Sequence, residues 1–225
     1  MERETEHRSE ERAVRISAGA IELEGNLGIV EGAEGIVLFA HGSGSGRSSP
    51  RNLYVARELR QAGVSTLLID LLTAEEEALD LRTRQLRFDI GLLAERLVGA
   101  TGWLRDYPGT QNSKIGYFGA STGAGAALVA AAERPDEVGA VVSRGGRPDL
   151  AGEALSRVEA PTLLIVGGSD VPVIGMNEEA LERMHVEKQL EIIPGATHLF
   201  EEVGALEEVT RLAAAWFSHY LISRD

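Results

Sequence analysis

Short apolar runs recur along the chain, and longer stretches with a helical pattern of apolar positions separate them. The runs are GIVLFA (35–40), STLLID (65–70), KIGYFG (114–119), AVVSR (140–144), TLLIVGG (162–168) and QLEIIP (189–194). Continuous runs rich in Val, Ile and Leu are typical of strands that are buried on both faces. We therefore expect an α/β fold with a mostly parallel central sheet and helices on both of its faces.

The stretches between these runs carry helix start and stop signals. Helices are predicted over residues 50–63, 89–109, 122–135, 178–187 and 207–221. The first of them has Pro50 in its first turn and Gly63 at its end, where these residues are preferred. The segment 71–88, LLTAEEEALDLRTRQLRF, is the one long connection without a strand. A small helical lid and a plain solvated helix both fit its acids and arginines.

The N-terminal part predicts a different arrangement. AVRIS (13–17) and IELEGNLGIV (21–30) look like an antiparallel entry hairpin, with Gly25 and Asn26 at the turn. The opening MERETEHRSEER is highly charged, so we expect residues 1–12 to form a solvated arm. A single domain over 13–225 follows from the length and from the absence of a linker.

Composition excludes several classes of function. A formal net charge of -13 repels phosphate backbones, and no basic stripe offsets it, so nucleic acid is not expected as a partner. The chain has no cysteine, which rules out disulfides, thiolate zinc sites and a cysteine nucleophile. No apolar run approaches the ~18 residues that span a bilayer, so we expect a soluble, cytoplasmic protein that does not bind membranes.

The stretch GASTG (119–123) matches the nucleophile elbow G-x-S-x-G, in which a serine sits in a strained turn between a strand and a helix. Gly119 and Gly123 supply the small neighbours that such a turn requires. The alternative is an ordinary tight turn in which Ser121 only caps the following helix. The context favours the elbow, because KIGYFG is predicted as a strand and the residues after Ser121 as a helix.

Two further strand ends carry an acid and a histidine. Asp170 follows TLLIVGG and His198 follows QLEIIP, so the chain order is Ser121, Asp170, His198. Ligands of parallel sheets bind at the carboxyl ends of the strands, and Ser, Asp, His is the chain order that a serine triad at these strand ends requires. A serine needs an imidazole to take its proton and a carboxylate to orient that imidazole. Asp149, after the preceding strand, is the competing acid.

A hydrolase of this kind also needs two N–H donors for the oxyanion. The backbone of Thr122 is predicted as the first, and the backbone of Ser43 in HGSGSGRSSP (41–50) as the second, with Gly44 as the fallback. The same loop fails as a phosphate cradle, because Arg47 stands where a P-loop has lysine and His41 where it has glycine. His41 is expected to support its own loop.

We expect no metal and no cofactor. His7, His185 and His219 have no metal-ligand spacing, and no H-E-x-x-H motif occurs. Arg144 and Arg147 lie beside the predicted mouth of the site. They could attract an acidic substrate, although ion pairs with nearby carboxylates are the simpler role.

HGSGSG (41–46), GASTG (119–123), GGSD (167–170) and GATH (195–198) together resemble the α/β-hydrolase superfamily, and within it small dienelactone-hydrolase-like proteins. The resemblance covers residues from about 14 to the end and implies the α/β-hydrolase fold. Dienelactone hydrolases proper use a cysteine nucleophile, whereas this chain has Ser121. Similar hydrolase domains occur fused to phosphoribosyltransferases, and we expect no phosphoribosyltransferase domain in this sequence.

The hypothesis from the sequence is a serine hydrolase that cleaves small carboxylic esters or lactones through an acyl-enzyme on Ser121, as a monomer or homodimer. Two alternatives stay open. One is a non-catalytic binding module of the same fold, and the other is amide cleavage or perhydrolysis on the same triad.

Overall fold

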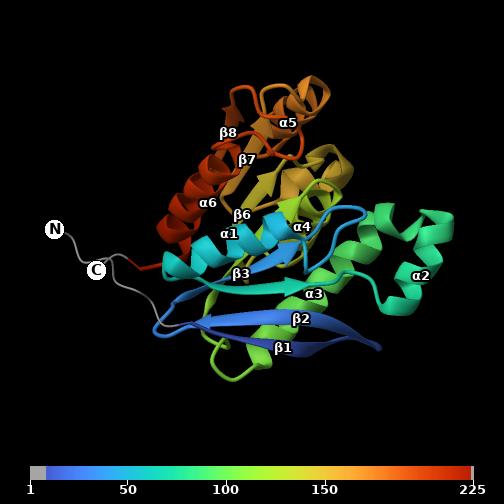
Figure 1. Cartoon of the computed structure of the whole chain (residues 1–225), viewed down its shortest axis with the longest axis vertical. Coiled ribbons are helices and arrows are strands. Elements are labelled where there is room, and N and C mark those ends of the chain that lie inside the picture. The colour runs from blue at the N-terminus through green and yellow to red at the C-terminus, as the bar shows by residue number, and fades with distance from the viewer. Residues whose placement is uncertain (1–8, 224–225) are drawn as a thin grey trace.

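The computed structural model describes residues 9–223, and a single sheet runs through the molecule (Figure 1). Within these residues the strands are β1 (Ser9–Ala18), β2 (Ile21–Val30), β3 (Gly35–Ala40), β4 (Ser65–Ile69), β5 (Lys114–Ala120), β6 (Val138–Arg144), β7 (Thr162–Gly167) and β8 (Lys188–Ile193). Their order in the sheet is β1-β2-β4-β3-β5-β6-β7-β8. Strands β3 to β8 are parallel, whereas β2 is antiparallel to both of its neighbours. The sheet is therefore mostly parallel, as the apolar runs predict.

Helices cover both faces of the sheet. They are α1 (Pro50–Gln61), α2 (Ala74–Thr83), α3 (Ile90–Asp106), α4 (Thr122–Glu133), α5 (Val171–Arg183) and α6 (Ala205–Leu221), with 3₁₀ turns η1 (Leu86–Phe88) and η2 (Pro148–Arg157). Helices α1 and α6 pack on one face, and α3, α4, η2 and α5 pack on the other. No helix in the described part of the chain has the length and apolar character needed to cross a membrane. Two apolar cores result, one on each side of the sheet.

The connection 71–88, which the sequence leaves without a strand, is helical. Thr73 and Glu76 form a reciprocal capping box that starts α2, and Asp89 caps α3 by accepting from the Leu92 amide at 3.0 Å. Helix α2 is tied to α3 by an ion pair of 2.8 Å between Glu76 and Arg96. The segment therefore has a fixed place at the carboxyl edge of the sheet, where Figure 1 shows α2 projecting from the body.

The N-terminal hairpin exists, but its predicted turn is wrong. The turn lies between Ala18 and Ile21, with Gly19 at φ 66°, while Gly25 and Asn26 pair inside β2. Position 25 requires a residue without a side chain because of packing: a Cβ there would lie 2.6 Å from Cδ1 of Ile16. A glycine that makes room for a neighbouring strand was mistaken for a turn residue.

The predicted boundary of the charged arm is also wrong. Residues 9–12 belong to β1 and pair with 27–30 of β2, so the sheet begins before residue 13. An edge strand can hold charged side chains because one of its faces meets water. Glu11 uses this position to form an ion pair with Arg60 of α1. Residues 1–8, with His7 and the rest of the predicted arm, lie outside the described residues.

Two glycines of α3 provide a test of this packing. A Cβ on Gly99 would lie 2.7 Å from Cβ and 2.9 Å from Cα of Ala18, whereas a Cβ on Gly102 would meet nothing within 4 Å. We expect Gly99→Ala to lower the free energy of unfolding by roughly 1–3 kcal/mol through overpacking. Gly102→Ala should raise it by about 0.5–1 kcal/mol, because alanine has the better helix propensity. Urea unfolding of both variants measures these two changes. Equal changes in the free energy of unfolding would contradict the close approach of α3 to the hairpin.

Candidate active site

Ser121 lies at the sharp turn between β5 and α4. Its backbone has φ 50° and ψ -122°, a conformation that costs a residue with a side chain roughly 1–3 kcal/mol. The two predicted glycines make this turn possible. A Cβ on Gly119 would lie 2.4 Å from Cα of Ala124, and a Cβ on Gly123 would lie 2.3 Å from the carbonyl oxygen of Ala40. The turn is therefore the strained elbow and not an ordinary helix cap.

Asp170 and His198 are brought into contact by the ends of β7 and β8. Nδ1 of His198 lies 2.6 Å from Oδ2 of Asp170, and the carboxylate side chain is 15% exposed against 39% for the imidazole. When the neutral ring donates its Nδ1 proton to Asp170, its Nε2 is left with a free lone pair. Asp149, the competing acid, is bound to Arg147 through two hydrogen bonds of 2.8 and 2.7 Å. Of the two acids, Asp170 is thus the one that contacts His198.

The loop after β6 joins the serine to the histidine. The Ser121 amide donates to the Arg144 carbonyl at 3.3 Å, and the Arg147 amide donates to the Ser121 carbonyl at 3.0 Å. A Cβ on Gly145 in the same loop would lie 3.6 Å from Cε1 of His198. Within residues 9–223 the Ser121 hydroxyl makes no hydrogen bond, and such contacts commonly tighten only when substrate binds. The backbone of Ser121 and the ring of His198 therefore both border this short loop.

The two residues predicted as oxyanion donors are neighbours. Thr122 is the first residue of α4, so its N–H has no acceptor within the helix. The Ser43 amide donates to Oγ1 of Thr122 at 2.9 Å. A Cβ on Gly42 would lie 3.1 Å from Cβ of Ser121, which shows how closely the loop after β3 approaches the elbow. The structure brings these two residues together, and the sequence gives no sign that the Ser43 amide is engaged by Thr122.

His41 supports the loop that follows β3, as expected. Its Nε2 accepts from the Leu71 amide at 3.0 Å, so its Nδ1 carries the proton and donates to the Gly42 carbonyl at 3.0 Å. Desolvation by the surrounding protein lowers the pKa of His41, although Asp70 and Glu77 act in the opposite direction. The neutral ring therefore connects the Ser43 loop to the end of β4.

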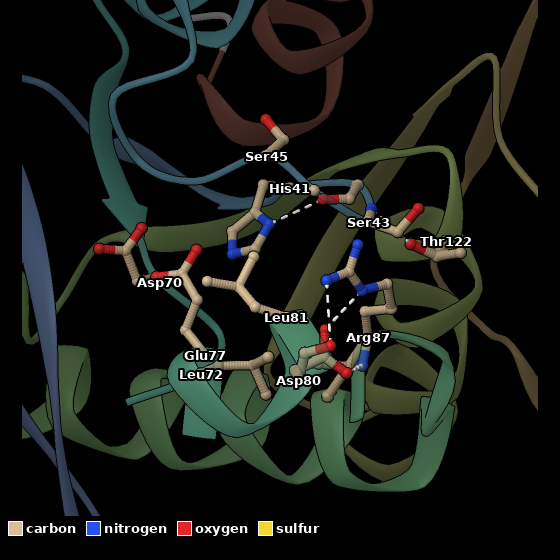
Figure 2. A pocket seen from close by; sticks show the side chains of 13 residues that line it. His41, Ser43, Ser45, Asp70, Leu72, Glu77, Asp80, Leu81, Arg87 and Thr122 are labelled. Carbon is tan, nitrogen blue, oxygen red and sulfur yellow. Dashed lines mark hydrogen bonds and ion pairs between the residues drawn. The ribbon is translucent and has the colours of Figure 1, made fainter. Parts of the chain in front are cut away.

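A cavity of about 120 Å³ opens between this loop and the segment 71–88 (Figure 2). Ser43 and Thr122 lie on one side of it, and Arg87 and Asp80 face them from the segment. The Arg87 guanidinium forms an ion pair with Asp80, which also accepts from the Arg87 amide at 3.2 Å. Sequence reasoning missed these two residues as cavity lining. Their spacing of seven residues carries no signal until the helix and the turn are folded together.

Arg144 and Arg147 differ in their environment. Arg147 has the ion pair that the sequence favours, with Asp149. Arg144 is only 8% exposed and has no carboxylate partner among the described residues; its Nη2 donates to Oδ1 of Asn52 at 3.3 Å. Burial lowers the pKa of Arg144 to about 10, and the charge of Arg51 contributes in the same direction. The ion-pair prediction is therefore wrong for Arg144.

A mostly parallel sheet with a strained serine turn after β5 and an acid–histidine pair after β7 and β8 is the α/β-hydrolase fold. Comparison with protein families gives a more specific result. The model of the dienelactone hydrolase family matches residues 33–219, and the chain belongs to this family. Its family and fold are those of a hydrolase.

Known proteins agree with this placement. The crystal structure of a dienelactone hydrolase from Anabaena variabilis is similar to this chain with a TM-score of 0.94 and 69% identity, over 96% of this chain and 100% of the other. A dienelactone hydrolase-like promiscuous phosphotriesterase from metagenomic libraries has a TM-score of 0.78 at 20% identity, over 95% and 99% of the two chains. The second likeness shows the fold alone.

A relative from Mycobacterium tuberculosis strain H37Rv bears the name of a phosphoribosyl transferase. It is 56% identical over 208 residues, which cover 92% of this chain and 46% of the relative. The chain thus spans about half the length of that protein.

Among the residues that the structure describes, no group of three or more histidine, aspartate or glutamate side chains could hold a metal ion.

The neutral His41 predicts a pH dependence of stability. Its pKa in the folded protein lies below the ordinary 6.5, so the unfolded chain takes up a proton first as the pH falls. The free energy of unfolding then decreases below about pH 6.5, by up to about 1.4 kcal/mol per pH unit from this group. His41→Asn removes the titration and should be less stable at pH 8, with the difference from wild type shrinking towards pH 5. The urea midpoints of wild type and His41→Asn at pH 8 and pH 5 measure this change. A stability difference between the two proteins that is the same at both pH values would contradict a neutral His41.

Proposed function

We propose that this protein hydrolyses carboxylic esters or lactones through an acyl-enzyme on Ser121. The observation that carries the proposal is the 2.6 Å contact between His198 and Asp170, made beside the loop that binds the Ser121 backbone. A carboxylate in this position fixes the imidazole tautomer and stabilises the imidazolium that forms when the ring accepts a proton. Family membership supports hydrolysis, and the pairing of these residues supports the serine route.

The reaction would proceed in two steps. The Ser121 hydroxyl attacks the substrate carbonyl while His198 Nε2 accepts the serine proton, and the carbonyl electron pair moves onto the oxygen. Collapse of this intermediate expels the alcohol, which takes the proton from His198. Water activated by His198 then attacks the acyl-enzyme, releases the acid and restores the serine. In a lactone the leaving alcohol stays attached to the acid, so the product is a single hydroxy acid.

The cavity beside Ser43 and Thr122 supports a small substrate; it adjoins the elbow through Thr122, and Ser121, His198 and Asp170 are not part of its lining. Its volume of about 120 Å³ is below the roughly 300–1,000 Å³ of sites for drug-sized ligands. The side chains of Leu72, Leu81 and Leu93 provide an apolar part of its wall, and the charged residues of the segment 71–88 provide a polar part. Short acyl groups fit this space better than long ones.

Ser121→Ala tests the nucleophile. Wild type should react with a fluorophosphonate probe and hydrolyse p-nitrophenyl esters, fastest for short acyl chains. Ser121→Ala should lose the labelling and several orders of magnitude of kcat, because only binding and oxyanion stabilisation remain. The variant should keep the circular dichroism and thermal midpoint of wild type.

Two outcomes contradict the proposal. A folded wild type that neither binds the probe nor cleaves esters would indicate a binding module. Equal turnover in Ser121→Ala would place the nucleophile elsewhere.

A matched pair of acids tests the orienting carboxylate. Asp170→Asn should lower kcat by roughly three to four orders of magnitude, since the amide favours the wrong imidazole tautomer. Asp149→Asn removes a carboxylate that is bound to Arg147 and not to His198, so kcat should stay near wild type. Steady-state kinetics on p-nitrophenyl acetate measure both. A larger loss in Asp149→Asn than in Asp170→Asn would reverse the assignment.

A further inference from the structure

The hydrogen bond between Ser43 and Thr122 changes the expected oxyanion site. An amide has one proton, and that of Ser43 is directed at Oγ1 of Thr122 over 2.9 Å. To bind an oxyanion directly, this amide would have to give up a hydrogen bond of good geometry. The structure therefore leaves one of the two expected donors engaged before substrate arrives.

The Thr122 hydroxyl has a proton of its own. Its Oγ1 acts as the acceptor for Ser43, and the structure records no acceptor for its hydrogen among residues 9–223. A threonine inside a helix can donate to the carbonyl of residue i−4, but Thr122 is the first residue of α4 and has no earlier turn of that helix. Its side chain lines the cavity and faces it together with Ser43 (Figure 2). The hydroxyl proton can consequently be directed into the cavity.

We propose that Thr122 supplies two oxyanion donors, its backbone N–H and its Oγ1–H, and that the Ser43 amide positions the hydroxyl. This inference rests on the proposed function of Ser121. Both Thr122 donors belong to the residue directly after the nucleophile, so the strained turn that exposes Ser121 also places them. The Ser43 amide does not contact the oxyanion itself. It donates a hydrogen bond to Oγ1 of Thr122 and thereby polarises the O–H bond of that hydroxyl.

Rotation of Thr122 to release the Ser43 amide is the less favourable alternative. The residue is β-branched, which restricts its χ1 angle, and only 3% of it is exposed. Gly123, the next residue, lies directly against the carbonyls of Ala40 and His41, so the backbone has little room to adjust. Turning the side chain would also leave the Ser43 amide without its acceptor until the oxyanion formed. A fixed hydroxyl that donates into the cavity avoids this cost.

In the reacting complex, no proton leaves Thr122. Oγ of Ser121 forms the bond to the carbonyl carbon, the π electron pair moves to the carbonyl oxygen, and His198 Nε2 receives the serine proton. The oxygen then accepts hydrogen bonds from the Thr122 N–H and Oγ1–H, which remain covalently intact. When the intermediate collapses, the electron pair returns to the carbonyl and both hydrogen bonds weaken.

Two substitutions at one position test the hydroxyl. Thr122→Val keeps the shape and the backbone N–H but removes the hydroxyl, so kcat for p-nitrophenyl acetate should fall roughly 100- to 1,000-fold with little change in KM. Thr122→Ser restores the hydroxyl and should recover most of the lost kcat. The rate of fluorophosphonate labelling should fall in parallel for Thr122→Val, while labelling carried to completion still reaches one probe per chain and shows a folded site.

The outcomes separate this inference from the proposed function. Wild type that neither labels nor cleaves esters overturns both. Active wild type with an equally active Thr122→Val overturns the hydroxyl donor alone. A rise in kcat for Thr122→Val also overturns it, because the hydroxyl would then block the Ser43 amide. A third result also counts against the hydroxyl donor. If Thr122→Val is never labelled by the probe and Thr122→Ser is labelled only slowly, the loss of activity comes from disturbed packing at position 122.

Discussion

The close approach of α4 to the end of β3 is the constraint on which the site depends. A glycine at position 123 is required there, because a Cβ would lie 2.3 Å and 2.4 Å from the carbonyl oxygens of Ala40 and His41. This contact brings the loop after β3 against the elbow, so that Gly42 lies beside Ser121 and Ser43 bonds to Thr122. The serine turn, the hydrogen bond from Ser43 to Thr122 and one wall of the cavity are thus products of one backbone contact.

Charge is distributed unevenly around this contact. The chain as a whole carries a formal net charge of -13, yet Arg144 is buried at the carboxyl end of β6 without an acidic partner among the described residues. His41, directly after the end of β3, is held neutral by desolvation and by the Leu71 amide, which donates to its Nε2. Positive charge at the carboxyl edge therefore comes from arginines, which stay protonated, and not from the histidine of the loop.

The sequence predicted the mostly parallel sheet and the strained turn at Ser121 because each rests on a local signal. Buried apolar runs indicate strands, and small residues around Ser121 indicate a strained turn. Signals that depend on folded neighbours were misread or missed. Gly25 looked like a turn residue because the cause of its small size, Ile16 on the adjacent strand, becomes visible only after pairing. The bond from Ser43 to Thr122 spans 79 positions and depends on one side-chain rotamer, which no pattern encodes.

The strained backbone of Ser121 links the shape of this turn to the packing of the sheet. Its positive φ is disfavoured locally and persists only while β3, β5 and α4 are packed together. Ala40 and Gly123 are far apart in the chain, so this packing depends on long-range contacts, which form only when distant segments come together. A partly loosened molecule can keep its strands and helices while the serine relaxes to an ordinary conformation. The backbone conformation of Ser121 therefore reports on the tightness of the native core more sensitively than secondary structure does.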